Sequence, residues 1–511
     1  MYRAGGRGVA WPAKLRERKE VSIVGSENSS RPHVLILMPD QFRADSLSCA
    51  GHPVVRTPNL DRLAAEGVRF ENAYTTCPVC MPARSSFLSG LFCHNHAQWG
   101  NYGHLPPEAD TFAKRLAAAG YRTCHVGKSH YYPHARGKHL GEHVPFMNAL
   151  GWQEVYEVTG PHATRTTDSI MTDHWRRVGC LETFRRDYSR REAAGWVAAT
   201  WPSPMPKGEG LDDFVGRTAV EYIACLDRDE PLLMFVGFGG PHEPWDPPAD
   251  WAEMYDPAKM DLAMPPAEPP AWLPPPAAEH QKKLQRAPEA LTGEVVGQIR
   301  ARYYAKISHI DWWIGRILEA LGDRGMLDNT AVVFWSDHGE MLCDKGRLYK
   351  SVFYDQAARV PMIVRTPDRR GAGSVSAALA SLVDIFPTVL ELARCEPKAS
   401  AFGRSLVPLL SDFSAPHHDA VFSEIDRRTM IRDDRYKMVV DCAGSVLKLY
   451  DMLEDSAEAV NLVGRKGTEG AIARLRDRML NWYLGTQLRQ DAWSAPAGAR
   501  AGRSRGRGAS V

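Results

Sequence analysis

The chain has 511 residues, of which 44% are hydrophobic and 24% charged, a composition typical of a globular enzyme with about two to four domains. Lysine and arginine total 63 against 61 acidic residues, and a net charge of only +2 argues against a dedicated nucleic-acid or membrane-surface binder. No apolar run approaches the roughly 18–20 residues that span a bilayer. The first 30 residues show no apolar leader stretch, which predicts a cytoplasmic protein.

Both ends of the chain are rich in glycine, arginine and serine without apolar periodicity, which predicts disordered tails over 1–30 and 491–511. An alternative for the basic C-terminal tail is weak nonspecific contact with polyanions. Between the tails, four short apolar runs are typical of buried parallel strands: His33–Met38, Leu232–Phe238, Thr330–Trp335 and Val360–Arg365.

Helices are expected between these runs. One begins at Thr57-Pro58 and ends at Gly67, a second runs from Asp110 or Thr111 to Gly120, and a long one covers about 292–321. The alternation predicts an α/β domain with a mostly parallel central sheet flanked by helices over 31–415, with a proline-rich surface excursion at 246–290.

Beyond residue 415 the pattern changes to short apolar runs separated by polar turns. Strands are expected over 420–424, 429–432, 436–440 and 446–450, and an amphipathic helix over about 470–484. We therefore predict a smaller C-terminal subdomain of antiparallel sheet plus helix over 416–490.

Polar side chains follow several of the predicted strands. Asp40 and Gln41 come after HVLILM, Asp337 and His338 after TAVVFW, His242 lies in GGPHEP, and Lys128 and His130 lie in GKSH. In open parallel sheets ligands bind beyond the carboxyl ends of the strands, so these groups are expected to converge. Two carboxylates, an amide oxygen and an imidazole suit a divalent cation, with Ca²⁺ as the first choice and Mn²⁺ and Mg²⁺ as alternatives.

The segment CPVCMPARSSFLSG contains a candidate nucleophile. Pro82 is expected to open a helix, which places Cys80 just before a helix N-terminus and Arg84 one turn on. Cys80 is then either a reactive thiolate or a buried structural cysteine. Cys77 and Cys80 also form a single C-x-x-C, but a second pair with zinc-finger spacing is missing.

The run Cys80-Met81-Pro82-Ala83-Arg84, followed by Ser89-Gly90, resembles the C-x-P-[S/A]-R signature of type I sulfatases. Further segments match family blocks in family order: LILMPDQFRAD, TPNLDRLAAEGVRFENAY, VGKSHY, GGPHEPW, WSDHGEML with Lys350, RVPMIV and LYDMLED. The resemblance covers roughly 31–485 and implies the alkaline-phosphatase-like α/β fold with a C-terminal subdomain. It also implies sulfate ester hydrolysis by a formylglycine (3-oxoalanine) made from Cys80, and hence a partner enzyme that generates formylglycine.

The resemblance further implies a role for each matching residue. Asp40, Gln41, Asp337, His338 and the modified Cys80 would hold the metal, and Arg84 would orient the hydrated aldehyde. Lys128, Lys350 and His242 would bind the sulfate, with His242 protonating the leaving alcohol. His130 would take a proton from the second hydroxyl so that sulfate is released, and Asn101 would contact substrate.

Two positions depart from many arylsulfatases. Gln41 stands where these have a second aspartate, and His338 where some have asparagine; both changes occur in the choline-sulfatase and phosphonate monoester hydrolase branches. Lys128 and His130 keep the sulfatase form, which favours a sulfate monoester over a phosphonate monoester or phosphodiester. A non-catalytic metal-binding scaffold is the alternative from another functional class.

The identity of the alcohol is left open. Trp245, Trp251 and Trp272 are candidates to line a pocket for a cationic or aromatic leaving group, and core or surface packing is the alternative for each. The oligomeric state is left open as well, with a homo-oligomer among the alternatives.

Overall fold

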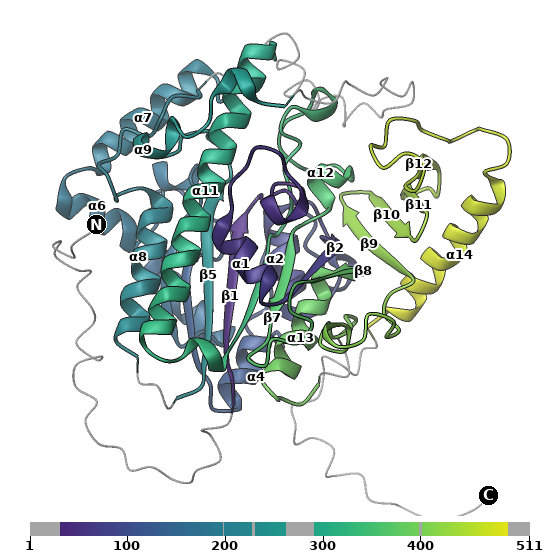
Figure 1. Ribbon diagram of the computed structural model, residues 1–511, viewed down its shortest axis with the longest axis horizontal. Coiled ribbons are helices and arrows are strands. Elements are labelled where there is room, and N and C mark those ends of the chain that lie inside the picture. The colour runs from purple at the N-terminus through teal and green to yellow at the C-terminus, as the bar shows by residue number, and fades with distance from the viewer. Residues whose placement is uncertain (1–30, 198, 227–229, 262–290, 398–400, 489–511) are drawn as a thin grey trace, which may run out of the picture.

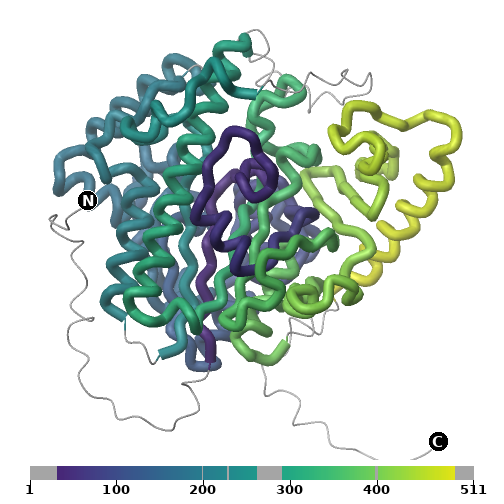
Figure 2. The backbone as a smooth tube through the Cα atoms, viewed as in Figure 1, coloured from purple at the N-terminus to yellow at the C-terminus, as the bar shows by residue number. Residues whose placement is uncertain are grey.

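The computed structural model describes residues 31–197, 199–226, 230–261, 291–397 and 401–488. Both predicted tails, 1–30 and 491–511, lie outside these ranges, and so does most of the proline-rich segment, including Trp272. None of the described helices is long and apolar enough to cross a membrane. Figure 2 traces the backbone through one large body, with the C-terminal segment set to one side of it.

Within the described residues, eight strands form the central sheet in the order β4-β3-β5-β1-β6-β7-β2-β8. Their bounds are β1 His33–Asp40, β2 Val68–Tyr74, β3 Arg122–Lys128, β4 Glu154–Val158, β5 Leu232–Pro241, β6 Thr330–Trp335, β7 Met362–Arg365 and β8 Ser374–Ser381. The strands β4, β3, β5, β1 and β6 run parallel to one another, which confirms the predicted mostly parallel α/β sheet.

The expectation that the run at 360–365 is a parallel strand is wrong. β7 pairs antiparallel with both β6 and β2. Its residues are as buried and apolar as those of its parallel neighbours, because helices cover both faces of the sheet here. Composition therefore could not reveal its direction.

Helices pack on both faces of the sheet (Figure 1). One face is covered mainly by α1 Pro58–Ala65, α6 Ile170–Val178, α7 Leu181–Ala194, α8 Leu211–Ala224 and α11 Gly293–Asp323. The other is covered mainly by α2 Cys80–Ser89, α4 Phe112–Ala118, α5 Val144–Ala149 and α13 Ile385–Leu392. The short helices α3 Cys93–His96, α9 Ala249–Ala252 and α12 Asp355–Ala358 lie in connections.

The helix boundaries follow local chemistry. Thr111 caps α4 by accepting a hydrogen bond from the N–H of Lys114 at 3.1 Å, and Thr292 caps α11. The expected start of α2 at Pro82 is wrong, because the helix begins at Cys80 and Pro82 lies in its first turn. Proline is tolerated there since first-turn N–H groups have no partner within the helix.

A second sheet in the described part of the chain has four strands in the order β12-β11-β10-β9. The strands are β9 Ala420–Ile425, β10 Arg428–Asp433, β11 Tyr436–Asp441 and β12 Val446–Asp451, all antiparallel, and α14 Glu469–Gly485 packs on them. This confirms the predicted sheet-and-helix subdomain. The exact boundary near residue 415 stays a prediction.

Candidate active site

Four potential metal ligands meet beyond the ends of the central strands. Asp40 ends β1, Asp337 and His338 follow β6, and Cys80 opens α2. The Cys80 Sγ lies 3.1 Å from His338 Nε2 and 3.9 Å from Asp40 Oδ1. The ligand atoms of all four residues lie within 4.8 Å of one another, and all four side chains are buried. The expected convergence of residues hundreds of positions apart is therefore present.

Arg84 joins the parts of this cluster. One turn into α2, it donates to Asp337 Oδ2 and to Asp40 Oδ2, each at 2.9 Å, and to the carbonyl oxygens of Lys128 and Ser129. Its side chain is completely buried. A planar guanidinium can serve four acceptors at fixed angles, so Arg84 holds the ends of three strands in register with the helix that carries Cys80.

Two lysines and a histidine provide positive charge and hydrogen bonds beside Cys80. Lys128, at the end of β3, pairs with Asp40. Lys350 donates to His242 Nε2 at 2.8 Å. The Nδ1–H of His242 donates to the Glu243 carbonyl at 2.8 Å, which leaves Nε2 as the only ring nitrogen able to exchange a proton with a ligand.

The backbones of β3 and β5 approach each other closely just before Lys128, and this places Lys128 beside Cys80. Gly127 has φ +93°, and a Cβ there would lie 2.0 Å from the Gly237 carbonyl oxygen of β5. Only glycine fits between the two strands at this point. Gln41 and His130 also have positive φ, at 67° and 51°, so two predicted site residues occupy a backbone conformation that non-glycine residues rarely adopt.

Gln41 lies in the cluster, but its side chain makes a different set of contacts from that of Asp40. Its amide nitrogen donates to Glu243 Oε2 at 2.7 Å and to Glu340, and its amide oxygen accepts from Lys350. Its backbone N–H donates to Asp337 Oδ1 at 3.1 Å. Gln41 thus connects the metal-type ligands to Lys350 and to two carboxylates.

The two remaining predicted residues lie close to this cluster. Asn101 accepts the N–H of Met81 at 3.1 Å, beside Cys80. The Nδ1 of His130 is buried and has no partner among the described residues, and its ring lies 5.0 Å from that of His134. Burial and the nearby Lys128 hold the pKa of His130 well below its ordinary value, so its ring is neutral.

The charges in the cluster depend on one another. Burial would raise the pKa of Asp40, but Lys128 and Arg84 hold it well below its ordinary value. Burial and Asp40 would raise the pKa of the Cys80 thiol, but Lys350 and His338 outweigh them and lower it. A carboxylate and a thiolate-prone sulfur therefore face the same small region.

The donor set fits a divalent cation. Asp40 and Asp337 offer carboxylate oxygens and His338 offers Nε2, while Gln41 meets this set through its backbone N–H, which donates to Asp337. Oxygen-rich sets with one imidazole suit Ca²⁺, Mn²⁺ or Mg²⁺. A derivative of Cys80 that carries oxygen in place of sulfur would complete the set with a further hard donor.

Two carboxylates that belong to the site were not assigned from the sequence, although they lie in the GGPHEP and WSDHGEML motifs. Glu243 follows His242, and Glu340 lies two positions after His338. Both hydrogen-bond Gln41. Burial and the neighbouring Glu243 raise the pKa of Glu340 to about 7. The signal available in the sequence was their adjacency to assigned residues.

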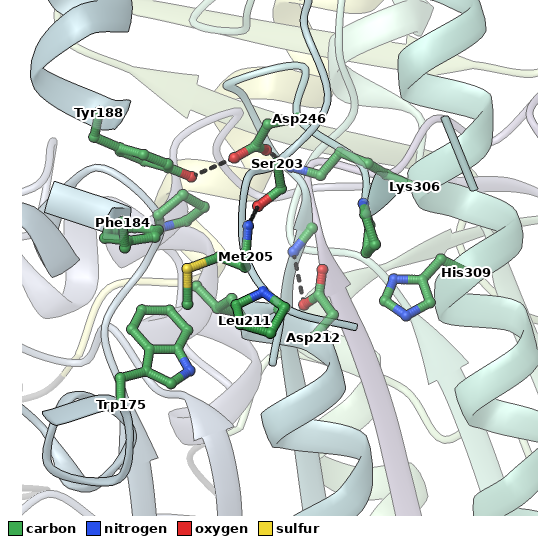
Figure 3. Close-up of a pocket in the computed structure, with 15 residues that line it drawn as sticks. Trp175, Phe184, Tyr188, Ser203, Met205, Leu211, Asp212, Asp246, Lys306 and His309 are labelled. Atoms are coloured by element: carbon green, nitrogen blue, oxygen red, sulfur yellow. Dashed lines mark hydrogen bonds and ion pairs between the residues drawn. The ribbon is translucent and has the colours of Figure 1, made fainter. Parts of the chain in front are cut away.

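Lys306 was missed as well. From the middle of α11 it donates to the carbonyl oxygens of His242 (2.8 Å) and Pro244 (3.0 Å) and pairs with Asp246 at 3.0 Å. Figure 3 shows Lys306 beside Asp246, which in turn accepts from Tyr188 at 2.7 Å. A charged side chain on the buried face of a helix was the available signal. Its contacts fasten the segment that carries His242.

The two candidate tryptophans in the described part of the chain, Trp245 and Trp251, pack against other aromatic side chains. Trp245 is fully buried and packs against Tyr303 in the core. Trp251 contacts His309 and Trp312, both of α11. Packing thus accounts for both, and Trp272 lies outside the described residues.

Comparison with known families agrees with this geometry. Residues 32–395 match the sulfatase family model, and residues 343–483 match the model described as N-sulphoglucosamine sulphohydrolase, C-terminal. The first range contains every residue of the cluster described above.

Relatives match over almost their whole length. An arylsulfatase of Clostridium perfringens is 28% identical over 476 residues, covering 89% of this chain and 95% of that protein. A multifunctional alkaline phosphatase superfamily protein of Trinickia caryophylli is 27% identical, covering 89% and 96%. The crystal structure of a phosphonate monoester hydrolase of Agrobacterium radiobacter superposes with a TM-score of 0.73 at 25% identity, covering 89% and 96%. With the fold, the ligand cluster and a family model spanning most of its length in agreement, the chain belongs to the sulfatase family of the alkaline phosphatase superfamily and is a sulfuric ester hydrolase.

Proposed function

We propose that this protein hydrolyses a sulfate monoester to sulfate and an alcohol, with a formylglycine derived from Cys80 as nucleophile. The observation that carries the proposal is the position of Cys80: it opens α2, touches His338, and lies among Arg84 and two lysines. A sulfur atom in a set of hard oxygen ligands is out of place, whereas an oxygen at the same position is not.

Part of the proposed chemistry comes from the bound cation and the modified side chain, and part comes from the other residues of the chain. When bound, a divalent cation would neutralise ester oxygens and the hydrated formylglycine would supply the attacking oxygen, with Asp40, Gln41, Asp337 and His338 as the protein ligands. The chain's own residues then bind and orient the ester. Lys128 and Lys350 bind the sulfate oxygens, where their charge also favours the transition state. Arg84 fixes the direction of side chain 80 through Asp40 and Asp337.

Two histidines handle protons in this proposal. His242 presents only Nε2 to the ligand, because Nδ1–H is bound to a carbonyl, and at that atom it relays a proton from the Lys350 ammonium to the leaving oxygen. His130 is neutral and its buried Nδ1 is unpartnered among the described residues, so it can take a proton from side chain 80 as sulfate leaves. Asn101 contributes a polar contact to substrate at the mouth of the same site.

Mass spectrometry of the peptide containing Cys80 tests the proposal. We expect the thiol to be replaced by an aldehyde in protein produced with a formylglycine-generating enzyme, and sulfatase activity to track the converted fraction. An unmodified thiol in fully active protein would refute the formylglycine step. Cys80→Ala should be inactive, and Cys225→Ala, which removes an exposed cysteine, is the matched control.

A second candidate is hydrolysis of phosphonate monoesters or phosphodiesters at the same site. It is supported by Gln41 and His338 in the ligand set and by the likeness to the Agrobacterium radiobacter enzyme. Lys128 and His130 favour the sulfate ester. Rates on an aryl sulfate and on a phenylphosphonate monoester of the same phenol decide between them, and we expect the higher kcat/KM for the sulfate.

A further inference from the structure

A second cluster of metal-type ligands lies outside the candidate active site. Asp384 is the residue that leads into α13, and His417 and His418 precede β9. The ligand atoms of the three residues lie within 4.8 Å of one another. The cluster therefore joins the start of α13 to the segment that enters the second sheet at β9; both elements are labelled in Figure 1.

Each histidine faces a different oxygen of one carboxylate. His417 Nε2 lies 3.3 Å from Asp384 Oδ2, and His418 Nε2 lies 2.7 Å from Asp384 Oδ1. The two rings are 4.5 Å apart between centroids and inclined at 62°. Ligands of a tetrahedral ion at about 2.0–2.1 Å are spaced about 3.3 Å from one another. The distance from His417 Nε2 to Asp384 Oδ2 already has that value. The distance from His418 Nε2 to Asp384 Oδ1 would have to lengthen only slightly.

The surroundings hold the carboxylate in place. Asp384 is completely buried and accepts the N–H of Ser381 at Oδ2 and the N–H of Arg404 at Oδ1, each at 2.8 Å. Arg404 also donates to the carbonyl of His417, which fixes the backbone between the two rings. Outer hydrogen bonds of this kind orient metal ligands and preserve their geometry.

An entry path for an ion is present as well. The His418 side chain is 15% exposed, and it lines a cavity of about 410 Å³ together with Arg404 and aromatic residues. The cavity can supply a water as a fourth ligand. The two imidazoles and one carboxylate differ from the oxygen-rich set at Asp40, because nitrogen donors predominate.

We propose that Asp384, His417 and His418 bind one divalent ion of the zinc class, with water as the fourth ligand. Two imidazole nitrogens and a carboxylate oxygen are a set that Zn²⁺ accepts in four-coordinate sites. Binding replaces the hydrogen bonds between the rings and the carboxylate with bonds to the metal, so any proton on the coordinating Nε2 atoms is released. The ion would link the start of α13 to the strand that begins the C-terminal sheet.

The test uses the full-length protein after chelation, and measures Zn²⁺ binding by calorimetry and Co²⁺ binding by visible absorption. Asp337→Asn weakens the active-site set, and the substitution of His418 then distinguishes the Asp384 cluster from the remaining group of His162, His242 and Glu243. We expect this variant to bind one equivalent of Zn²⁺ with a Kd of about 1 µM or tighter, and zinc to raise its Tm by about 3 °C. Adding His418→Gln should abolish both effects.

His139→Gln is the matched control, because His139 also pairs with an aspartate, Asp173, at 3.1 Å but belongs to none of the three-ligand groups among the described residues. It should leave zinc binding by Asp337→Asn unchanged. His417→Gln provides a second route should His418→Gln fold poorly. Absence of zinc binding in Asp337→Asn, or binding that survives both histidine substitutions, overturns the proposal. Neither outcome bears on sulfate ester hydrolysis.

Discussion

Arg84 carries more of the active-site geometry than any other single side chain described. It is fully buried and contacts both metal-type carboxylates and two backbone carbonyls. A buried cation with four acceptors is stable only as long as all of them stay paired, because each unpaired charge would lie in a low-dielectric environment. Its role is therefore electrostatic and geometric at once.

Arg84→Lys should reduce kcat by about 10²–10³-fold, because an ammonium cannot reach Asp40, Asp337 and the Lys128–Ser129 carbonyls together. The measurement is kcat on an activated aryl sulfate, with metal content determined in parallel. Arg316→Lys, at an exposed pair with Glu319, is the control and should be neutral. Parent-like kcat in Arg84→Lys would contradict this account.

Lys306 is expected to act on the reaction through His242. Lys306→Met keeps the length of the side chain but releases the His242–Asp246 segment, so the proton transfer to the leaving group should weaken. We expect kcat to fall about 10²-fold for esters of weakly acidic alcohols, and much less for esters of acidic phenols. Kinetics on a series of leaving groups provides the measurement.

Lys259→Met, at an exposed lysine, is the matched control for Lys306→Met. The double variant Lys306→Met/Asp246→Asn removes the buried carboxylate that would otherwise lose its partner. Comparison with this double variant separates a loss of folding stability from a loss of His242 positioning. An equal loss of kcat for all leaving groups would show that Lys306 does not act through His242.

At the scale of elements, β4 supports the loop that carries His130. Glu157 of β4 accepts hydrogen bonds from Ser129 and from the Tyr132 hydroxyl, on either side of that histidine. Burial raises the pKa of Glu157 to about 7, although both hydrogen bonds lower it. The loop after β3 is thus tied to the neighbouring strand by a carboxyl group that is largely protonated below neutral pH.

This raised pKa predicts a specific pH dependence of stability. Between about pH 4.5 and 7 the folded protein keeps a proton that the unfolded chain releases, so the free energy of unfolding falls as pH rises through this window. The loss amounts to at most about 3 kcal/mol. Glu157→Gln, which cannot ionise, should remove that part of the slope in urea unfolding at pH 5 and pH 8. An unchanged difference between the two pH values would be inconsistent with this pKa.

At the scale of the whole molecule, a buried ion cluster connects the two sheets. Lys437 of β11 pairs with Glu458 at 2.9 Å and with Asp355 of α12, which belongs to the larger body. Its side chain is completely buried. Aromatic packing adds to this connection, since Trp482 of α14 stacks on Phe422 at 4.2 Å and contacts Phe92 near α3.

Lys437→Met should lower the free energy of unfolding by about 3–5 kcal/mol, because the buried Glu458 and the mostly buried Asp355 lose their cation. Calorimetry on parent and variant measures this, and we expect one of the two parts to unfold at lower temperature. Lys466→Met, at an exposed lysine, is the control. A Tm equal to that of the parent would exclude a stabilising role for the cluster.

How far the sequence could predict the site depended on the residue. Asp40, Asp337 and His338 directly follow apolar runs, and the signature around Cys80 is contiguous, so local pattern was sufficient to find them. Glu340 and Lys306 could not be assigned in this way, because their importance depends on contacts with Gln41 and with the His242 segment across about 300 and 60 residues.

By itself, the sequence determined the alternation of strands and helices, the C-terminal sheet and the identity of most cluster residues, since these follow from periodicity, turn residues and short motifs. Only the tertiary structure decided the antiparallel direction of β7 and the start of α2 at Cys80. It also placed Glu243, Glu340 and Lys306 around the site, and Asp384, His417 and His418 around one another. The physical reason is that strand direction and charge pairing depend on neighbours that are distant in the chain, and a buried residue has the same local pattern whichever neighbour it meets.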